Sequence, residues 1–209
     1  MSKANKTTSK TTTTTTTSAQ DLQTAIVEAF QVRIDNAENE NQRDYLTKEK
    51  RFFEDKNAEI IIEKSMQYID FARFANQIKI TEKKNRDYLA QYVINKIRRF
   101  AYGIANNTKS FIDGYSNSIL FNLSELQNMT MKSRLVSLSK SAVYLETEKI
   151  QEIKRKINVS LNTADTQASS SKQAFIFLNI TNGQKGKRDD DIEFKDNDTA
   201  NFVKAWFAQ

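Results

Sequence analysis

The chain contains no proline and only four glycines among its 209 residues. Proline removes a backbone donor and clashes with the preceding helical turn, and glycine weakens a helix through its backbone freedom. Because both residues are scarce, long uninterrupted helices are the expected structure, and sandwiches or small barrels with many tight turns are disfavoured. The expected fold class is mainly α: a helical bundle of about five helices with a C-terminal β-hairpin and a short final helix.

Composition divides the chain into three expected parts. Residues 1–18 carry a threonine run and three lysines. Because apolar residues are almost absent there, nothing offsets the cost of ordering the segment, and we expect a disordered, Thr-rich, basic tail. Residues 19–160 form the expected helical domain. Residues 161–209 are expected to be a polar linker followed by a small hairpin-helix appendage.

Apolar residues recur at helical spacing along the middle of the chain. In the first expected helix, Leu22, Ile26, Phe30 and Ile34 form one stripe. Ser18 is its predicted cap, with Asp21 in the first turn. Four further helical regions are expected, at residues 44–79 with a break near 55–57, at 81–104 with a stop at 106–108, at 109–122 and at 130–157.

The pattern changes in the last fifth of the chain. Residues 175–180 are aromatic and β-branched, and residues 192–195 alternate between apolar and charged. Two such runs joined by a polar loop with glycine predict a β-hairpin. Asp198 is the predicted cap of the final helix. This helix carries candidate partner-docking residues, with closure of the core as the alternative role: Phe202, Trp206 and Phe207.

The absence of histidine and cysteine excludes several classes of chemistry. Ser-His-Asp and Cys-His nucleophile systems, the usual zinc sites and disulfides all require these residues. The scattered glycines form neither of the Gly-rich loops that bind nucleotide phosphates. We therefore expect no cofactor and assign no catalytic and no metal-ligating residue.

The sequence also bears on localisation. Its first residues lack the apolar core of a signal peptide, and its longest apolar run, residues 174–178, is too short to span a bilayer. We expect no membrane partner and a cytoplasmic protein. The composition also suits a phage or plasmid accessory protein, in which case the cytoplasm is that of the host cell.

Positive charge is concentrated in one part of the chain. Residues 81–156 hold fourteen basic and seven acidic side chains, a net charge of +7, whereas residues 21–80 have a net charge of −3. Such an excess favours a polyanionic partner, nucleic acid first. The candidate nucleic-acid-binding residues are Lys83, Lys84, Arg86, Tyr88, Tyr92, Lys96, Arg98, Arg99, Lys132, Arg134, Lys154, Arg155 and Lys156.

Two local patterns refine these assignments. Tyr88, Tyr92, Lys96 and Arg99 fall beside the apolar stripe of the third helix, where aromatic rings can stack on bases and cations can pair with phosphates. The alternative is that the tyrosines edge the core and the cations are solvated. Residues 122–135 are compatible with the turn and second helix of a helix-turn-helix, with Lys132 and Arg134 at the start of that helix. Ordinary helix pairs produce the same pattern.

A single short segment suggests an enzyme. Glu193-Phe194-Lys195 on the predicted strand, close to Asp189–Asp191, resembles the E-x-K half of the metal-dependent nuclease pattern PD-(D/E)xK. The resemblance implies acidic residues that hold Mg²⁺ and a lysine that positions the attacking water. Alternation on a half-exposed strand explains the same residues without chemistry.

The first hypothesis is therefore a non-enzymatic nucleic-acid-binding protein with a basic helical surface, and DNA is the favoured partner. The second is a structural or assembly protein, such as a virion component or an adaptor, that acts through helix-mediated protein contacts or as a homo-oligomer. The third is the metal-dependent nuclease.

Overall fold

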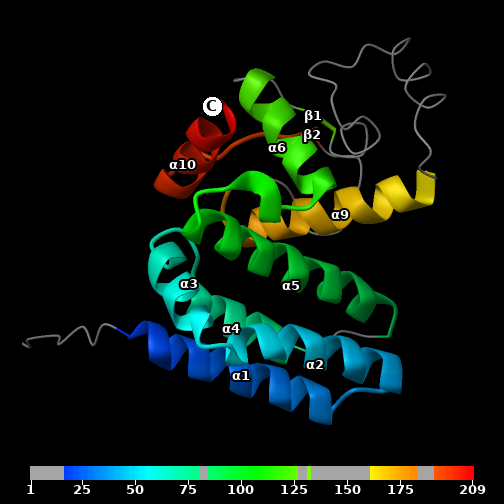
Figure 1. The fold of residues 1–209 in the computed structure, drawn as a ribbon. Helices are drawn as coiled ribbons and strands as arrows, with labels where there is room; N and C mark the ends of the chain where they lie inside the picture. Colours follow the sequence, from blue (N-terminus) through cyan, green and yellow to red (C-terminus); the bar gives the residue numbers. More distant parts are fainter. Residues whose placement is uncertain (1–16, 81–83, 127–130, 133–160, 183–190) are drawn as a thin grey trace, which may run out of the picture.

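The protein is mainly helical (Figure 1). The computed structural model describes residues 17–80, 84–126, 131–132, 161–182 and 191–209. In chain order, the elements are α1 (Ala19–Asp35), α2 (Glu40–Glu54), α3 (Asn57–Ser65), α4 (Phe71–Lys79), α5 (Lys84–Ala105), the 3-10 turn η1 (Lys109–Phe111), α6 (Gly114–Leu126), β1 (Met131–Lys132), α9 (Leu161–Phe177), β2 (Asp191–Ile192) and α10 (Asp198–Phe207). The expected mainly α fold class and helical bundle are confirmed. The described residues form eight α-helices instead of about five and a short final helix, because the region 44–79 is divided into α2, α3 and α4. No described helix is both long and apolar enough to cross a membrane.

Short polar side chains begin four of the described α-helices. The Ser18 hydroxyl accepts a hydrogen bond from the backbone N–H of Asp21 at 3.1 Å, and the Asp21 carboxylate accepts one from the backbone N–H of Ser18 at 3.2 Å. This reciprocal pair confirms the predicted start of α1. Asn39, Asp70 and Asn197 cap α2, α4 and α10 in the same position. The cap of the last helix is therefore Asn197, one residue before the expected Asp198.

Asparagines end two of the longest helices. Asn107 after α5 and Asn179 after α9 have positive φ angles of 48° and 60°. In each case the N–H of the following residue reaches back five residues, from Thr108 to the Gly103 carbonyl at 2.9 Å and from Ile180 to the Phe175 carbonyl at 2.8 Å. Asparagine tolerates this left-handed conformation better than most residues, so these helices end sharply without glycine or proline. The predicted stop at residues 106–108 is confirmed.

The helices pack in layers around α5. In Figure 1, α1, α2 and α4 lie on one side of α5, and α9, α6 and α10 lie on the other. Helix α1 packs against α2 and α4, α5 packs against α3 and α9, and α10 packs against α6. A helix with neighbours on both sides buries most of its circumference. Some charged side chains of α5 are therefore buried together with the apolar ones.

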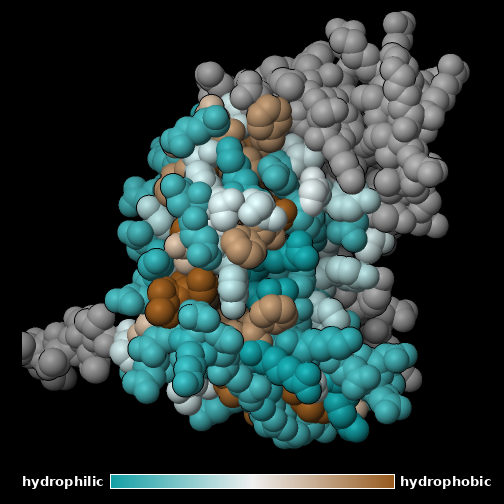
Figure 2. Space-filling view, viewed as in Figure 1, coloured by the Kyte–Doolittle hydropathy of each residue, from teal (hydrophilic) through white to brown (hydrophobic). Residues whose placement is uncertain are grey.

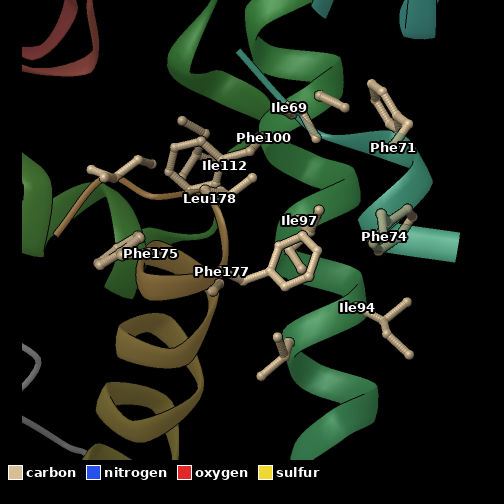
Figure 3. Close-up of a cluster of buried hydrophobic side chains, with 14 of the residues drawn as sticks. Ile69, Phe71, Phe74, Ile94, Ile97, Phe100, Ile112, Phe175, Phe177 and Leu178 are labelled. Carbon is tan, nitrogen blue, oxygen red and sulfur yellow. The ribbon is translucent and has the colours of Figure 1, made fainter. Parts of the chain in front are cut away.

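One hydrophobic core connects these layers. Figure 3 shows side chains from α4, α5 and α9 gathered along α5. Phe100 of α5 meets Phe175 of α9 edge-on, with 5.9 Å between ring centres, and Phe74 of α4 meets Phe177 at 6.3 Å. Such contacts add to the burial of apolar area. The C-terminal segment therefore contributes to the same core as the N-terminal helices.

The expected C-terminal β-hairpin is not supported. Residues 162–172, expected to be a linker, and residues 175–177, expected in the first strand, belong to α9. Helical burial of Phe175 and Phe177 outweighs the preference of aromatic residues for strands. After α9, Thr181 forms only an isolated bridge with Phe194. The two-residue strand β2 pairs instead with β1, antiparallel.

Some expectations fall on residues that the structure does not describe. These are the tail up to residue 16, the hairpin tip at residues 183–190 and most of the fifth helix at 130–157. Within that helix, only Met131 and Lys132 are described, and they form β1. The predicted domain boundary at residue 160 borders the undescribed segment 133–160, so the domain division stays a prediction.

Candidate nucleic-acid interface

Helix α5 carries the densest set of candidate phosphate contacts, and two of its cations are buried. Lys96 is 3% exposed and Arg98 is 8% exposed. At about 100° per residue, these two positions flank the apolar stripe of Val93, Ile97 and Phe100 on opposite sides. Neighbouring helices cover both flanks, because α5 lies inside the bundle.

Arg98 forms an internal ion pair with Glu49 of α2. Its Nε donates to Glu49 Oε2 at 2.8 Å, and the amide of Asn95 donates to Glu49 Oε1, also at 2.8 Å. The guanidinium carbon lies 3.7 Å from the ring centre of Phe52, a cation–π contact. Both Arg98 and Glu49 thus have partners inside the protein, and Arg98 is not available to a phosphate.

Lys96 is held on the other flank of α5. Its Nζ donates to Asp113 Oδ1 at 2.8 Å and to Gln167 Oε1 of α9 at 3.2 Å. Asp113 Oδ1 also accepts the backbone N–H of Ser116 at 3.1 Å, near the start of α6. Lys96 therefore joins α5, α6 and α9, and it too is not available to a phosphate.

The pKa values of this pair follow from burial and from the pairing itself. Burial lowers the pKa of Lys96 below its ordinary value, and the Asp113 carboxylate opposes that shift. Burial alone would raise the pKa of Asp113. The positive charge of Lys96 and the hydrogen bonds from Lys96 and Ser116 outweigh that effect, so the pKa of Asp113 lies below its ordinary range.

Ser116 lies beside Lys96 in an arrangement that resembles an activated nucleophile. A lysine with a lowered pKa next to a serine can act as its base. Here Lys96 Nζ lies 3.4 Å from Ser116 Oγ, which shares a hydrogen bond of 2.9 Å with Ser171. Ser116 is fully buried, so the hydroxyl has no access to a substrate. The cluster stabilises the packing of α5, α6 and α9.

The other candidates on α5 have different positions. Arg99 lies on the side of α5 opposite the core stripe and is half-buried, as is Tyr92. Lys84, Arg86 and Tyr88 belong to the first turns of the helix. Among the three cations of α5 whose burial is described, Lys96, Arg98 and Arg99, it is Arg99 that keeps a route to solvent.

Most of the remaining candidates lie outside the described residues: Lys83, Arg134, Lys154, Arg155 and Lys156. Lys132 is described, and its backbone forms β1 rather than the start of a recognition helix. The helix-turn-helix interpretation of residues 122–135 is therefore not supported at Lys132. Its other residues beyond α6 are not described.

The aromatic residues of α10 pack inward. Trp206 is 6% exposed and Phe207 1% exposed. Phe202 is half-buried and stacks on Tyr68, with 4.0 Å between ring centres. These contacts give the three expected docking residues a role in closing the core, which was the alternative interpretation of the final helix.

The described part of the nuclease-like segment makes amide contacts. The Glu193 carboxylate accepts from the Asn182 amide at 2.6 Å, and Lys195 Nζ donates to the Asn179 side chain at 2.7 Å. Asp189 and Asp190 are not described. Among the described residues, no group of three acidic side chains is arranged to hold a metal ion.

No family model, curated protein or solved structure matches this chain. Any interface of this protein is therefore inferred from the chemistry of the residues in the chain itself. Figure 2 shows a mainly hydrophilic face on which hydrophobic side chains lie in separate patches. Among the described residues, the large exposed hydrophobic side chains include Phe52 at 39% and Phe111 at 43%.

An open cleft of about 700 Å³ includes the Phe52 ring, and we call it the aromatic cleft. It is lined by Tyr45, Lys48, Glu49, Arg51, Phe52, Asp55, Asn57 and Tyr102. Tyr45, Glu49 and Phe52 lie on one face of α2, at spacings of four and three residues. The Tyr45 hydroxyl donates to the Gln91 carbonyl at 2.8 Å, and Phe52 meets Tyr102 edge-on at 6.4 Å. The cleft is thus formed where α2 meets α5.

Some charged side chains of the aromatic cleft have partners within the protein, and others do not. Glu49 is bound by Arg98, and Asp55 Oδ1 accepts the backbone N–H of Asn57 at 2.8 Å. Lys48 and Arg51 are exposed and make no hydrogen bond or ion pair with the described part of the chain. Sequence reasoning missed this site because residues 21–80 are acidic overall. The alternation of aromatic and basic residues at 45, 48, 51 and 52 was the available signal.

Proposed function

We propose that this protein is a non-enzymatic nucleic-acid-binding protein that uses the positive charge of residues 81–156, with DNA as the first partner to test. The observation that carries the proposal is the charge excess that remains once the two buried ion pairs are set aside. Lys96 and Asp113 neutralise each other, and Arg98 is neutralised by Glu49 from outside the segment. Beyond these pairs the segment has twelve basic and six acidic side chains. An excess of this size attracts phosphates.

The position of the cations at the start of α5 supports the same proposal. The N-terminal end of a helix carries partial positive charge, so basic residues there do not stabilise the helix. Lys84 and Arg86 nevertheless stand in its first turn, and Lys83 precedes it. Acidic residues, Glu82 and Asp87, are fewer in this stretch. A phosphate would be favoured both by the cations and by the backbone N–H groups that a helix start leaves without helical acceptors.

The experiment is a fluorescence titration of labelled DNA and RNA at two salt concentrations, roughly 50 and 200 mM, where electrostatic binding differs strongly. Lys84→Glu and Arg99→Glu each reverse one charge of the proposed surface, and we expect weaker binding for both. Lys79→Glu is the matched control, because Lys79 is an exposed cation at the end of α4 and outside the segment. Equal affinities for all three variants and the unchanged protein would reject the proposed surface.

The structural or assembly hypothesis stays a separate prediction. It requires a defined oligomer or a stable protein complex, which size-exclusion chromatography with light scattering measures directly. A monomer at all concentrations would reject the homo-oligomeric form of that hypothesis.

A further inference from the structure

We propose that the aromatic cleft between α2 and α5 binds an unpaired base of single-stranded nucleic acid, with the neighbouring phosphates held by Lys48 and Arg51. This inference rests on the proposed function and names a substrate class and a site that the charge distribution alone does not supply.

The partial exposure of Phe52 is the first reason. Phe52 is 39% exposed, and the guanidinium carbon of Arg98 lies over its ring, 3.7 Å from the ring centre. A partly exposed ring that is supported by a neighbouring cation can serve as a stacking surface. Bases stack on such rings irrespective of sequence, because every base presents a flat π face.

The geometry around Phe52 sets the size and shape of the ligand. Tyr102 stands edge-on to Phe52, and Tyr45 is anchored through its hydroxyl to the α5 backbone. The volume of about 700 Å³ is within the range of small-ligand clefts, and it is open to solvent on one side. An unstacked base fits such a cleft, whereas the paired and stacked bases of a duplex expose no ring face to it.

The balance of charge decides the sign of the ligand. Glu49 and Arg98 neutralise each other, and the Asp55 carboxylate accepts a backbone N–H but keeps its negative charge. The two exposed cations, Lys48 and Arg51, have no described partner, so the lining residues together with Arg98 carry one more positive than negative charge. This excess favours a flat apolar group linked to phosphates over a cationic peptide.

Tyr102 contributes a hydrogen-bond donor at the wall of the cleft. Burial raises the pKa of its hydroxyl above the ordinary value, against the effect of Arg98. The hydroxyl is protonated at neutral pH, as it would be at the ordinary pKa of 10.0, and it can donate to a ring nitrogen or a carbonyl of a base.

The test uses the full chain, a labelled oligothymidylate of about 20 nucleotides, which is long enough for at least one typical binding site, and a duplex of equal length. Phe52→Leu keeps an apolar side chain beside Arg98 but removes the ring, together with its cation–π contact. We expect it to weaken single-strand binding roughly tenfold without changing the salt dependence. Arg51→Ala is expected to weaken binding and to reduce the slope of log affinity against log salt by about 0.7, one phosphate contact. Arg43→Ala, which removes an exposed cation from the same helix outside the cleft, is the matched control.

The outcomes separate the two proposals. If oligothymidylate binds and both cleft variants behave like Arg43→Ala, the cleft is not the site, and the proposed function stands. Binding of the duplex alone also overturns the cleft. A free mononucleotide that binds as tightly as the oligonucleotide would identify a nucleotide site instead of a single-strand site. If no nucleic acid binds at the lower salt concentration, the proposed function and the cleft inference fail together. Unfolding midpoints of the variants, measured in parallel, show that each one folds.

Discussion

Arg98 Nε of α5 donates a hydrogen bond of 2.8 Å to Glu49 Oε2 of α2, while the same guanidinium lies 3.7 Å from the ring centre of Phe52. One side chain thus neutralises a buried carboxylate and supports the exposed ring of the aromatic cleft. The sequence pattern suggested Arg98 as a phosphate contact, but in the structure its charge joins α5 to α2. The aromatic cleft depends on the Arg98–Glu49 pair for its structure, although Arg98 itself is not one of the proposed ligand contacts.

Replacement of Arg98 by methionine should destabilise the protein by about 3–5 kcal/mol, because Glu49 is left as a buried charge without its cation. Denaturant titration measures the free energy of unfolding of Arg98→Met. Arg43→Met, at an exposed site of α2, is the control. A second replacement, Glu49→Leu in the Arg98→Met background, should recover much of the loss. Similar small losses for Arg98→Met and Arg43→Met would show that the pair does not exist in solution.

Asp113 should make stability depend on pH in the acid range. Its pKa is lower in the folded protein than in the unfolded chain, so between these two values the unfolded state binds more protons and stability rises with pH. The contribution is fully present above the ordinary value of 3.8 and is lost as the pH falls through the folded value. In Asp113→Asn, the loss of stability between about pH 5 and pH 2 should be shallower than in the unchanged protein. Parallel curves would contradict the pair with Lys96.

Two glycines provide a matched pair of substitutions. A Cβ at Gly103 would lie 3.1 Å from the Thr108 carbonyl oxygen and 3.2 Å from the Trp206 ring, so Gly103→Ala should cost about 1–3 kcal/mol. At Gly114, the first residue of α6, a Cβ would meet no atom within 4 Å, and Gly114→Ala should be neutral or stabilising by up to about 1 kcal/mol. Thermal unfolding measures both. Equal effects would contradict the close packing of Thr108 and Trp206 around Gly103.

The sole tryptophan reports on the position of α10. Because Trp206 is 6% exposed, its fluorescence should be blue-shifted and weakly quenched by iodide in the native protein. Phe207→Ala, which removes a ring that is 1% exposed, should destabilise the protein by about 3–5 kcal/mol. Strong quenching by iodide together with a small loss of stability would favour the sequence-based prediction that these aromatic residues dock a partner.

Several helix boundaries in the first half could be predicted because their signals are local, whereas the break between α3 and α4 was not predicted. The Ser18–Asp21 cap, the apolar spacing of α1, the break at residues 55–57 and the asparagine stop after α5 all act within a few residues. Helix α9 could not be predicted in the same way. Its serines suggest a linker, yet Ser170 and Ser171 are fully buried. Small side chains let α9 approach its neighbours closely, and their hydroxyls bond to the Gln167 carbonyl and to Ser116.

The site was harder to predict than the fold. The positions of Lys96 and Arg98 beside an apolar stripe are equally compatible with a solvated flank and with a flank covered by another helix. Their carboxylate partners are far away in the sequence: Glu49 is 49 residues from Arg98, and Asp113 is 17 residues from Lys96. Tertiary pairing at such separations leaves no periodic signal. The aromatic cleft likewise needs Tyr102 of α5 to complete the face of α2.

Binding of single-stranded nucleic acid at the aromatic cleft is decided by the affinity of the full chain for labelled oligothymidylate at about 50 and 200 mM salt, with Phe52→Leu, Arg51→Ala and Arg43→Ala in parallel. We expect salt-dependent binding that Phe52→Leu and Arg51→Ala weaken and Arg43→Ala does not. Absence of binding to any nucleic acid at the lower salt concentration would contradict both the cleft and the proposed function.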